Sequence, residues 1–165
     1  MVRTATIDDL GSIEAIYSGA RAFMKEHGNP TQWGNGYPER GMLCEDIASS
    51  SLYIIEREGR NAGVFYFAVA EDSTYSHIEG RWSSEMPYGV VHRIAASAGF
   101  HGILSEALSF AFSRIGYVRI DTHRDNIPMR TALQKSGFAE CGIIHTYDGT
   151  ERIAYDKAAE DVFSV

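Results

Sequence analysis

The stretch YGVVHRIAASAGFHGILSEALSFAFSRIG, residues 88–116, decides the fold of this chain. Its beginning, Tyr88–Ala96, is apolar and β-branched and predicts a buried strand. A short loop with two glycines follows, and apolar residues at helical spacing then predict an amphipathic helix from Ile103 to Ile115. Unpaired N–H groups at the start of such a helix bind phosphate readily, although an ordinary strand-to-helix turn would have the same pattern.

The loop does not match the common phosphate-binding motifs. No Gly-Lys-Ser/Thr follows it, as in a Walker loop, and the Gly-x-Gly-x-x-Gly dinucleotide pattern is incomplete. Ser105, in the first turn of the predicted helix, would add a hydroxyl to an anion site. Both interpretations of the loop therefore remain open at this point.

The residues on either side predict a mixed sheet. Strand–helix–strand passages in the second half predict parallel pairing, whereas hairpin signals at 58–61 and at Asp148-Gly149, a type I′ signal, predict antiparallel pairing. The sequence predicts one domain over residues 1–165, of the α/β class (α+β mixed sheet), with a central, partly parallel sheet flanked by helices on both faces. The predicted elements are strand 3–6, helices 8–25 and 39–49, strands 52–57, 62–70, 75–82 and 88–96, helix 103–115, strand 117–122, helix 127–136, and strands 139–146 and 151–157.

Composition excludes several classes of protein. The chain has 165 residues, of which 44% are hydrophobic and 22% charged, which is typical of one globular domain. Its longest apolar run, Val64–Ala70, is far shorter than the about 20 residues of a membrane helix, and the first residues lack the features of a signal peptide. Cys44 and Cys141 are too few for a disulfide framework, and the scattered histidines predict no metal site. We therefore expect a cytoplasmic protein without a metal.

Charge is distributed unevenly along the chain. The net charge is −7, but residues 90–140 carry six basic and four acidic side chains. We expect no binding to nucleic acid or to a membrane, because both need basic patches. A positive segment in an acidic chain would suit a phosphorylated ligand together with a cationic one, and the alternative is a set of solvated faces.

A second stretch, IDTHRDNIPMRTALQKSGF at residues 120–138, gives the first one a context. Together the two stretches resemble the GNAT superfamily of acyl-CoA-dependent N-acyltransferases. That family carries Gln/Arg-x-x-Gly-x-Gly/Ala at the start of a helix and then Asn-x-x-Ala-x-x-x-Tyr-x-x-x-Gly-Phe. Asn126 and the pair Gly137-Phe138 lie at the distances of the family, and the resemblance covers nearly the whole chain.

The chain departs from both family motifs. Of the first motif only Gly102 is retained, since Gly99 stands at the Gln/Arg position and Leu104 at the Gly/Ala position. Leu133 stands where many members have the tyrosine that protonates the leaving thiolate. The resemblance therefore supports binding of CoA more firmly than any particular acid catalyst.

The resemblance implies a GNAT-like fold with a cofactor site along the deciding stretch. Backbone groups at the end of the strand would pair with pantetheine, and the N–H groups from Phe100 to Ser105 would hold the pyrophosphate. Arg130 and Lys135 are cationic candidates for the adenosine phosphates, with a solvated helix face as the alternative. The implied cofactor-binding residues are Ile94, Ala95, Ala96, Phe100, His101, Gly102, Ile103, Leu104, Ser105, Asn126, Met129 and Lys135.

Transfer of an acyl group from a thioester to an amine needs a base and a donor for the oxyanion. His92 in the cofactor strand and His123 just past the next strand are candidate bases, because histidine titrates near neutrality. Each of them would otherwise be a packed structural residue. Glu79 would act through water, and Tyr147 is a candidate acid by residue type.

The segment HGNPTQWGNGYP, residues 27–38, is the predicted acceptor site. The corresponding segment of the family lines the acceptor groove, so Glu26, Trp33 and Tyr37 become candidate acceptor-binding residues. The two rings could stack on an ammonium, or Trp33 could instead anchor the loop to the core. Glu26 could also act as a base through water.

These expectations favour an N-acetyltransferase that transfers an acetyl group from acetyl-CoA to a primary amine of a small molecule or peptide. We expect direct transfer in a ternary complex, because no cysteine lies in a motif position. One alternative is a catalytically inactive CoA-binding sensor or partner module, and another is that Leu104 prevents binding of CoA. The expected partners are acetyl-CoA and an amine-bearing acceptor, and sheet edges of such folds would permit a homodimer.

Overall fold

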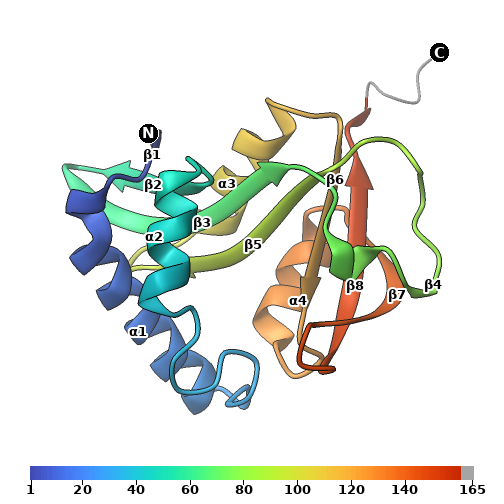
Figure 1. Ribbon diagram of the computed structural model, residues 1–165, viewed down its shortest axis with the longest axis horizontal. Coiled ribbons are helices and arrows are strands. Elements are labelled where there is room, and N and C mark those ends of the chain that lie inside the picture. The colour runs from blue at the N-terminus through green and yellow to red at the C-terminus, as the bar shows by residue number, and fades with distance from the viewer. Residues whose placement is uncertain (161–165) are drawn as a thin grey trace. The chain divides into compact units, whose positions relative to one another are not determined.

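The strands form a mixed sheet in the order β1-β2-β3-β5-β6-β8-β7-β4 (Figure 1). The computed structural model describes residues 1–160, and the prediction of a mixed, partly parallel sheet with helices is confirmed. The elements are β1 (Val2–Thr4), the 3-10 helix η1 (Ile7–Asp9), α1 (Leu10–Glu26), α2 (Arg40–Ala48), β2 (Leu52–Arg57), β3 (Arg60–Val69), the 3-10 helix η2 (Ser73–Tyr75), β4 (Glu79–Gly80), β5 (Gly89–Ala96), α3 (Ile103–Phe112), β6 (Tyr117–Thr122), α4 (Ile127–Lys135), β7 (Ala139–His145) and β8 (Glu151–Ala158).

Pairing follows the connections that the sequence predicts. The parallel pair joins β5 to β6, with Gly89 opposite Val118, and a helix connects these two strands. The pairs β1·β2, β2·β3, β6·β8, β7·β8 and β4·β7 are antiparallel. The contacts divide the chain into two compact units, which are described separately: unit 1 comprises residues 1–67 and 92–110, and unit 2 comprises residues 68–91 and 111 onward. That residues 1–165 form one domain stays a prediction.

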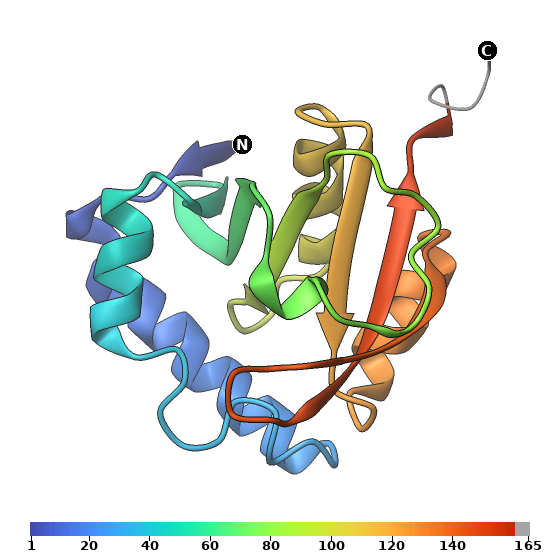
Figure 2. The ribbon, with the colours of Figure 1, turned by 45° about the vertical axis from the view of Figure 1, so that its right-hand side comes forward.

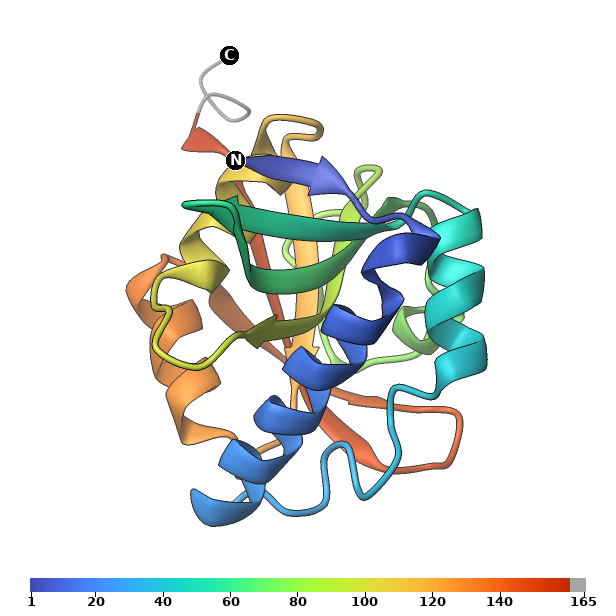
Figure 3. The same cartoon turned by 90° about the vertical axis from the view of Figure 1, so that its left-hand side faces the viewer.

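In unit 1, helices cover both faces of the strands (Figure 3). Leu52 and Ile54 of β2 are fully buried in a core that includes residues of α1 and α2. Tyr53 lies between them and packs on Phe110 of α3, with ring centroids 4.6 Å apart. Side chains that alternate in sequence thus enter two cores, as expected of a strand buried on both faces.

The β2–β3 hairpin turns through two residues, Glu58 (φ 53°) and Gly59 (φ 71°). Two successive residues with positive φ are the requirement of a type I′ turn, which suits the twist of antiparallel strands. The hairpin brings Arg57 opposite Arg60, so both arginines lie at the same end of the strand pair.

The prediction of a type I′ turn at Asp148-Gly149 is wrong. Residues 146–150 form a wider loop, in which Thr146 N donates to Thr150 O at 2.9 Å and only Gly149 has a positive φ, of 82°. The carboxylate of Asp148 accepts from Thr150 N at 3.0 Å and from the hydroxyls of both threonines. Side-chain acceptors of this kind compete with the tight turn and stabilise the wider one.

The prediction of a strand over 75–82 is also wrong for most of its length. Ser73–Tyr75 forms a 3-10 helix, and only Glu79–Gly80 pairs with β7 in unit 2. A side chain at Gly80 would meet Cys141 O at 2.2 Å, so β4 approaches β7 at glycine positions. Trp82 turns into the core instead, where its Nε1 donates to Tyr75 O at 3.1 Å.

Unit 2 is held together around a buried arginine. Arg119 is 4% exposed, and its guanidinium lies 4.3 Å from the ring centroid of Trp82 and 4.1 Å from that of Tyr88. The carboxylate of Asp156 accepts from Ser83 N at 2.6 Å. Cation–π contacts and hydrogen bonds therefore fasten the connector 76–88 over β6 and β8 (Figure 2).

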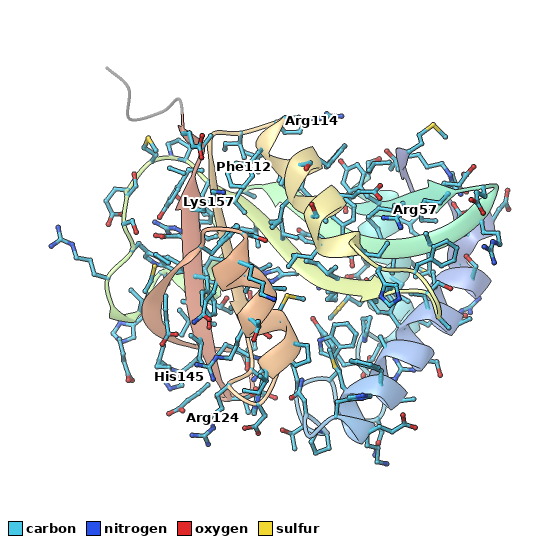
Figure 4. The ribbon with its side chains drawn as sticks, turned by 180° about the vertical axis from the view of Figure 1, so that it is seen from behind. Arg57, Phe112, Arg114, Arg124, His145 and Lys157 are labelled. Carbon is cyan, nitrogen blue, oxygen red and sulfur yellow. The ribbon has the colours of Figure 1, made fainter. Side chains whose placement is uncertain are left out.

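Helix α4 is attached to β8 in the same unit. Lys157 Nζ donates to Ser136 O at 2.7 Å, at the C-terminal end of the helix, and lies 5.7 Å from the ring centroid of Phe112 (Figure 4). The predicted helix 103–115 ends three residues early, at Phe112. None of the helices in residues 1–160 is long and apolar enough to cross a membrane.

An ion pair joins β1 to the start of α1 in unit 1. Arg3 Nη1 and Nη2 each lie 2.8 Å from a carboxylate oxygen of Asp9, and Thr6 N donates to the same carboxylate at 2.8 Å. These hydrogen bonds from Arg3 hold the pKa of Asp9 well below its usual range. Asp9 therefore acts as both ion-pair partner and N-terminal capping group.

We predict that Asp9→Ala lowers the free energy of unfolding at pH 7 by about 1–2 kcal/mol, because the cap and the charged hydrogen bonds are lost together. A lowered native pKa means that the contribution of Asp9 is complete above about pH 4 and is lost as the pH falls further. Urea unfolding at pH 7 and pH 3 measures both effects. Asp8 is exposed and adjacent to Asp9, so Asp8→Ala is the control. If Asp9→Ala lowered the free energy of unfolding by the same amount at pH 7 and at pH 3, the prediction would be contradicted.

Candidate functional site

The loop between β5 and α3 has the conformation that its glycines allow. Gly99 (φ 82°) and Gly102 (φ 75°) both lie in the left-handed region, which other residues rarely adopt. Phe100 N donates to Ser97 O at 3.1 Å and closes a turn inside the loop. Helix α3 then begins at Ile103, as predicted.

The first turn of α3 presents backbone donors. The amides of Ile103, Leu104 and Ser105 have no acceptor within the helix, because the first amides of any α-helix lack one, and the helix dipole adds partial positive charge there. Leu104 is half-buried and does not prevent the helix from starting. The amide of Phe100 is engaged with Ser97, so among the predicted pyrophosphate contacts this one shapes the loop instead.

Gly63 of β3 lets the first residue of α3 pack closely on the strand, and sequence reasoning missed it. A Cβ on Gly63 would lie 2.6 Å from Cγ2 of Ile103 and 3.0 Å from the carbonyl oxygen of Ala95. The missing side chain therefore lets Ile103 pack directly on the strand. A glycine inside an apolar strand pattern is the signal that could have indicated this close approach.

Two arginines of the β2–β3 hairpin contact the loop, and sequence reasoning missed them too. Arg57 forms an ion pair with Glu106 of α3, and its Nη1 donates to His101 O at 2.8 Å (Figure 4). The guanidinium of Arg60 lies 4.8 Å from the ring centroid of Phe100. An acidic residue in the first turn of a helix, with basic residues in a nearby hairpin, was the available signal.

The centre of β5 departs from regular strand geometry at Arg93, whose φ is 51°. Its carbonyl accepts from the hydroxyl of Tyr17 at 2.8 Å, and its guanidinium forms an ion pair with Asp46. The guanidinium also lies 4.6 Å from the ring centroid of Tyr66 and donates to the hydroxyl of Tyr37 at 3.3 Å. We call these five residues the Arg93 cluster.

Burial and charge act on the cluster in opposite directions. Burial alone would lower the pKa of Arg93, but the nearby Tyr37, Asp46 and Tyr17 outweigh it and raise that pKa. Burial raises the pKa of Tyr17 as well, so both groups keep their protons. The Nε of Arg93 is buried and has no hydrogen-bond partner among residues 1–160.

One predicted site residue of unit 1 belongs to the Arg93 cluster, and a second lies beside it. Tyr37 belongs to it, and the ring of His92 lies 6.0 Å from that of Tyr66. Trp33 is 8% exposed and packs edge-on against Tyr17 at 5.5 Å, which favours the interpretation that it anchors the loop to the core. Glu26 is exposed at the end of α1.

The predicted cofactor residues that follow β6 belong to unit 2. Asn126 caps α4, since its side chain accepts from Met129 N at 3.2 Å. Lys135 is exposed in the last turn. Arg130 is engaged inside the unit, with Nε 3.3 Å from the hydroxyl of Tyr155 and Nη1 3.0 Å from the carbonyl oxygen of Arg124.

His123, also in unit 2, has one ring nitrogen occupied. Its Nδ1 accepts from Asp125 N at 3.1 Å, so a neutral ring carries its proton on Nε2. Burial lowers the pKa of His123, and the charge of Arg152 lowers it further. The ring is therefore neutral at pH 7 and acts as a donor at Nε2.

The remaining candidates of unit 2 lie at the surface. Glu79 is exposed on β4, and Tyr147 is 88% exposed, with its hydroxyl 2.7 Å from that of Ser73. Residues 1–160 contain no group of three or more His, Cys, Asp or Glu side chains that could hold a metal ion. Both cysteines are free, and burial raises the pKa of Cys141 to about 12, which keeps its thiol protonated.

Comparison with known proteins relates this fold to acetyltransferases. A crystal structure of a GNAT-family acetyltransferase from Streptococcus agalactiae is 28% identical over 97% of this chain and 95% of its own, with a TM-score of 0.87. The aminoglycoside acetyltransferase AAC(6')-Ib in complex with coenzyme A is 19% identical over 96% of this chain and 94% of its own, with a TM-score of 0.66. The same enzyme in complex with paromomycin and acetyl-CoA is 20% identical over 100% of this chain and 97% of its own, with a TM-score of 0.68.

No family model matches the sequence, and no curated protein matches it. The relationship therefore rests on the structure and on the two motif stretches. Strand order, the glycine loop that opens α3 and the similarity to the streptococcal acetyltransferase over nearly the whole length agree with one another. This chain belongs to the GNAT superfamily.

Proposed function

We propose that the protein is an acetyl-CoA-dependent N-acetyltransferase that acetylates a primary amine of a small molecule or peptide. The observation that carries the proposal is the loop 97–102, with positive φ at Gly99 and Gly102, opening directly into the N-terminus of α3. Related acetyltransferases in complex with coenzyme A and with acetyl-CoA support the choice of cofactor.

The residues of unit 1 fit this cofactor. No atom lies within 4 Å of a Cβ built on Gly99, and Gly102 and Ser105 are exposed, so the loop amides and the first turn of α3 are open to an anion. Backbone groups of Ile94, Ala95 and Ala96 at the end of β5 would pair with pantetheine. Acetyl-CoA supplies an activated thioester when it is bound, so binding and deprotonation of the amine are the tasks left to the chain. The roles of Asn126, Met129 and Lys135 stay predictions that rest on the family resemblance.

Among the candidate bases, His92 has the stronger support. It lies on β5, two residues before the backbone groups that we assign to the cofactor, and its ring lies near Tyr66. Nδ1 of His123 is occupied, which leaves that ring a donor rather than an acceptor. In this scheme His92 takes one proton from the ammonium group of the acceptor, a C–N bond forms as the C–S bond breaks, and the leaving thiolate takes a second proton from the same nitrogen. Glu79 and Tyr147 stay weaker candidates because both are exposed.

The acceptor is proposed to be cationic. The net charge of the chain is −7, and Glu26 and Tyr37 offer a carboxylate and a ring near the end of α1 and the loop that follows it. An aminoglycoside, a polycationic amine, is bound by one structural relative. A homodimer, a location in the cytoplasm and the absence of nucleic-acid or membrane partners stay predictions.

One observation favours the alternative of a CoA-binding module without activity. Leu133 stands at the position of the family tyrosine and is 0% exposed, so this position offers neither a hydroxyl nor access to a ligand. A thiolate can take its proton from the amine directly, which is why we prefer the enzyme. Release of thiol from acetyl-CoA across a panel of amines distinguishes the two, because the module would bind acetyl-CoA without amine-dependent release.

We predict micromolar binding of acetyl-CoA in isothermal titration and a loss of at least about 100-fold in that affinity for Gly102→Asp. A side chain at this positive φ strains the loop, and its Cβ would lie 3.7 Å from Nη2 of Arg57, so the new carboxylate adds negative charge to the loop and competes for Arg57. Gly102→Ala introduces the same backbone strain without the charge. It is therefore the matched control and should lose less affinity for acetyl-CoA than Gly102→Asp. No binding at millimolar acetyl-CoA would reject both the enzyme and the sensor.

We predict that His92→Gln lowers kcat by about 100-fold while the Kd of acetyl-CoA stays within about twofold, because loss of a general base affects the chemical step. His123→Gln should change kcat by less than about fivefold, since glutamine retains a donor. Steady-state rates of thiol release measure both variants. A larger effect at His123 than at His92 would reverse the assignment.

We predict that His123 titrates below the ordinary histidine value of 6.5, since its lowered pKa means that the ring binds a proton only in more acidic solution. An NMR titration of the ring protons measures this midpoint directly. Protonation of the ring is less favourable in the native state than in the unfolded state. As the pH falls from 7 to 5, the free energy of unfolding should therefore decrease less for His123→Gln than for the wild type. A midpoint at or above 6.5 would contradict the prediction.

A further inference from the structure

We propose that Arg57 is a positioning residue for the pyrophosphate of the cofactor, and that its contacts with His101 and Glu106 set the affinity of the loop for that anion. The proposal rests on the proposed function, since it concerns the same loop. It assigns a functional role to the β2–β3 hairpin, for which the sequence analysis predicted none.

Arg57 connects three parts of unit 1. From the end of β2, its Nε donates to Glu106 Oε1 at 2.8 Å, and its Nη2 contacts the same oxygen. Its Nη1 donates to His101 O at 2.8 Å. About one third of the side chain is exposed, so the guanidinium lies at the edge of the loop rather than in the core.

The bond to His101 orients a peptide group. A trans peptide is planar, so its C=O and N–H point in opposite directions. When Arg57 holds the carbonyl of His101, the N–H of Gly102 must point to the other side of the loop. Arg57 thereby keeps a carbonyl, which repels anions, away from the side where the amide of Gly102 is presented.

The bond to Glu106 removes a repulsion. Glu106 lies in the first turn of α3, next to the amides that we assign to the anion, and an unpaired carboxylate there would oppose a pyrophosphate. The ion pair with Arg57 neutralises it. Arg57 thus does two things for the same anion, one through backbone geometry and one through charge.

Arg60 holds the other part of the loop. Its guanidinium stacks 4.8 Å from the ring centroid of Phe100, and the two-residue turn at Glu58 and Gly59 delivers both arginines to the same end of the hairpin. The loop is therefore supported from one side along its length, and its opposite side keeps the backbone donors.

Four variants test the proposal by isothermal titration with acetyl-CoA and by competition with inorganic pyrophosphate. They are Arg57→Ala, Glu106→Gln, the double variant, and the control Arg40→Ala, which removes an arginine of the exposed ion pair Arg40–Glu14 in the same unit. Arg57→Lys, which keeps the charge, replaces Arg57→Ala if the latter does not fold. S-acetylpantetheine, which has no pyrophosphate, is the control ligand for kinetic assays.

We expect Arg57→Ala to weaken binding of acetyl-CoA and of pyrophosphate by about tenfold, with kcat at saturating acetyl-CoA and the KM of S-acetylpantetheine within about twofold. On a logarithmic scale, the double variant should recover about half of the affinity that Arg57→Ala loses. Its Glu106→Gln substitution removes the repulsion of the anion, but the orientation of the peptide between His101 and Gly102 is not restored. For Arg40→Ala and Glu106→Gln, the Kd of acetyl-CoA should rise by no more than about twofold over that of the wild type.

Equal binding by Arg57→Ala and the wild type would overturn this proposal alone. A double variant no better than Arg57→Ala, or an equal loss for S-acetylpantetheine, would also overturn it, because both results indicate general disorder of unit 1. Failure of the wild type to bind acetyl-CoA would overturn the proposed function and this proposal together. Binding with the expected pattern but without release of thiol would leave the proposal standing and reject the enzyme.

Discussion

The arrangement of unit 1 depends on a non-glycine residue held at positive φ inside a strand. Arg93 at φ 51° adopts a conformation that costs of the order of 1–3 kcal/mol and persists only where the surroundings enforce it. Tyr17 from α1 holds its carbonyl, and its side chain is held by Asp46 from α2, by Tyr37 from the loop between α1 and α2, and by Tyr66 from β3. Every element on one face of the strands therefore contributes to the same residue. What this geometry positions is the end of β5, and with it the loop that opens α3.

Both units bury an arginine against aromatic rings. In unit 2 the guanidinium of Arg119 lies over the rings of Trp82 and Tyr88, as that of Arg93 lies over Tyr66 in unit 1. A buried guanidinium needs partners, because desolvation of an unpaired charge is costly, and ring faces supply part of the lost hydration. Arg57 is different, since one third of its side chain remains exposed and its partners are a carbonyl and a carboxylate. An arginine that is buried against aromatic rings stabilises a core. An arginine that is partly exposed and contacts polar groups can instead influence a bound anion.

The sequence predicted those features that depend on local spacing. The strand, loop and helix of the deciding stretch and the parallel pairing of β5 with β6 follow from periodicity, glycine positions and chain connections. It could not predict contacts between residues distant in the chain, such as Arg57 with His101 or Gly63 with Ile103, because each partner alone looks ordinary. The two wrong predictions have the same origin. Side-chain acceptors at Asp148 and a core position for Trp82 outweighed the local preferences for a tight turn and for a strand.

The departures from the family motifs affect binding and catalysis differently. An anion held by backbone amides requires a conformation rather than particular side chains, and the loop has glycine at both of its positions of positive φ, Gly99 and Gly102. Leu104 replaces a small residue, yet α3 still begins at Ile103 and the leucine side chain is half-buried. Proton transfer, in contrast, requires a side chain with a titratable atom, and a buried leucine cannot replace a tyrosine. The same degree of divergence therefore leaves the conformation of the loop intact but removes the side chain that a proton transfer at position 133 would need, and this is why our proposal places the base elsewhere, at His92 on β5.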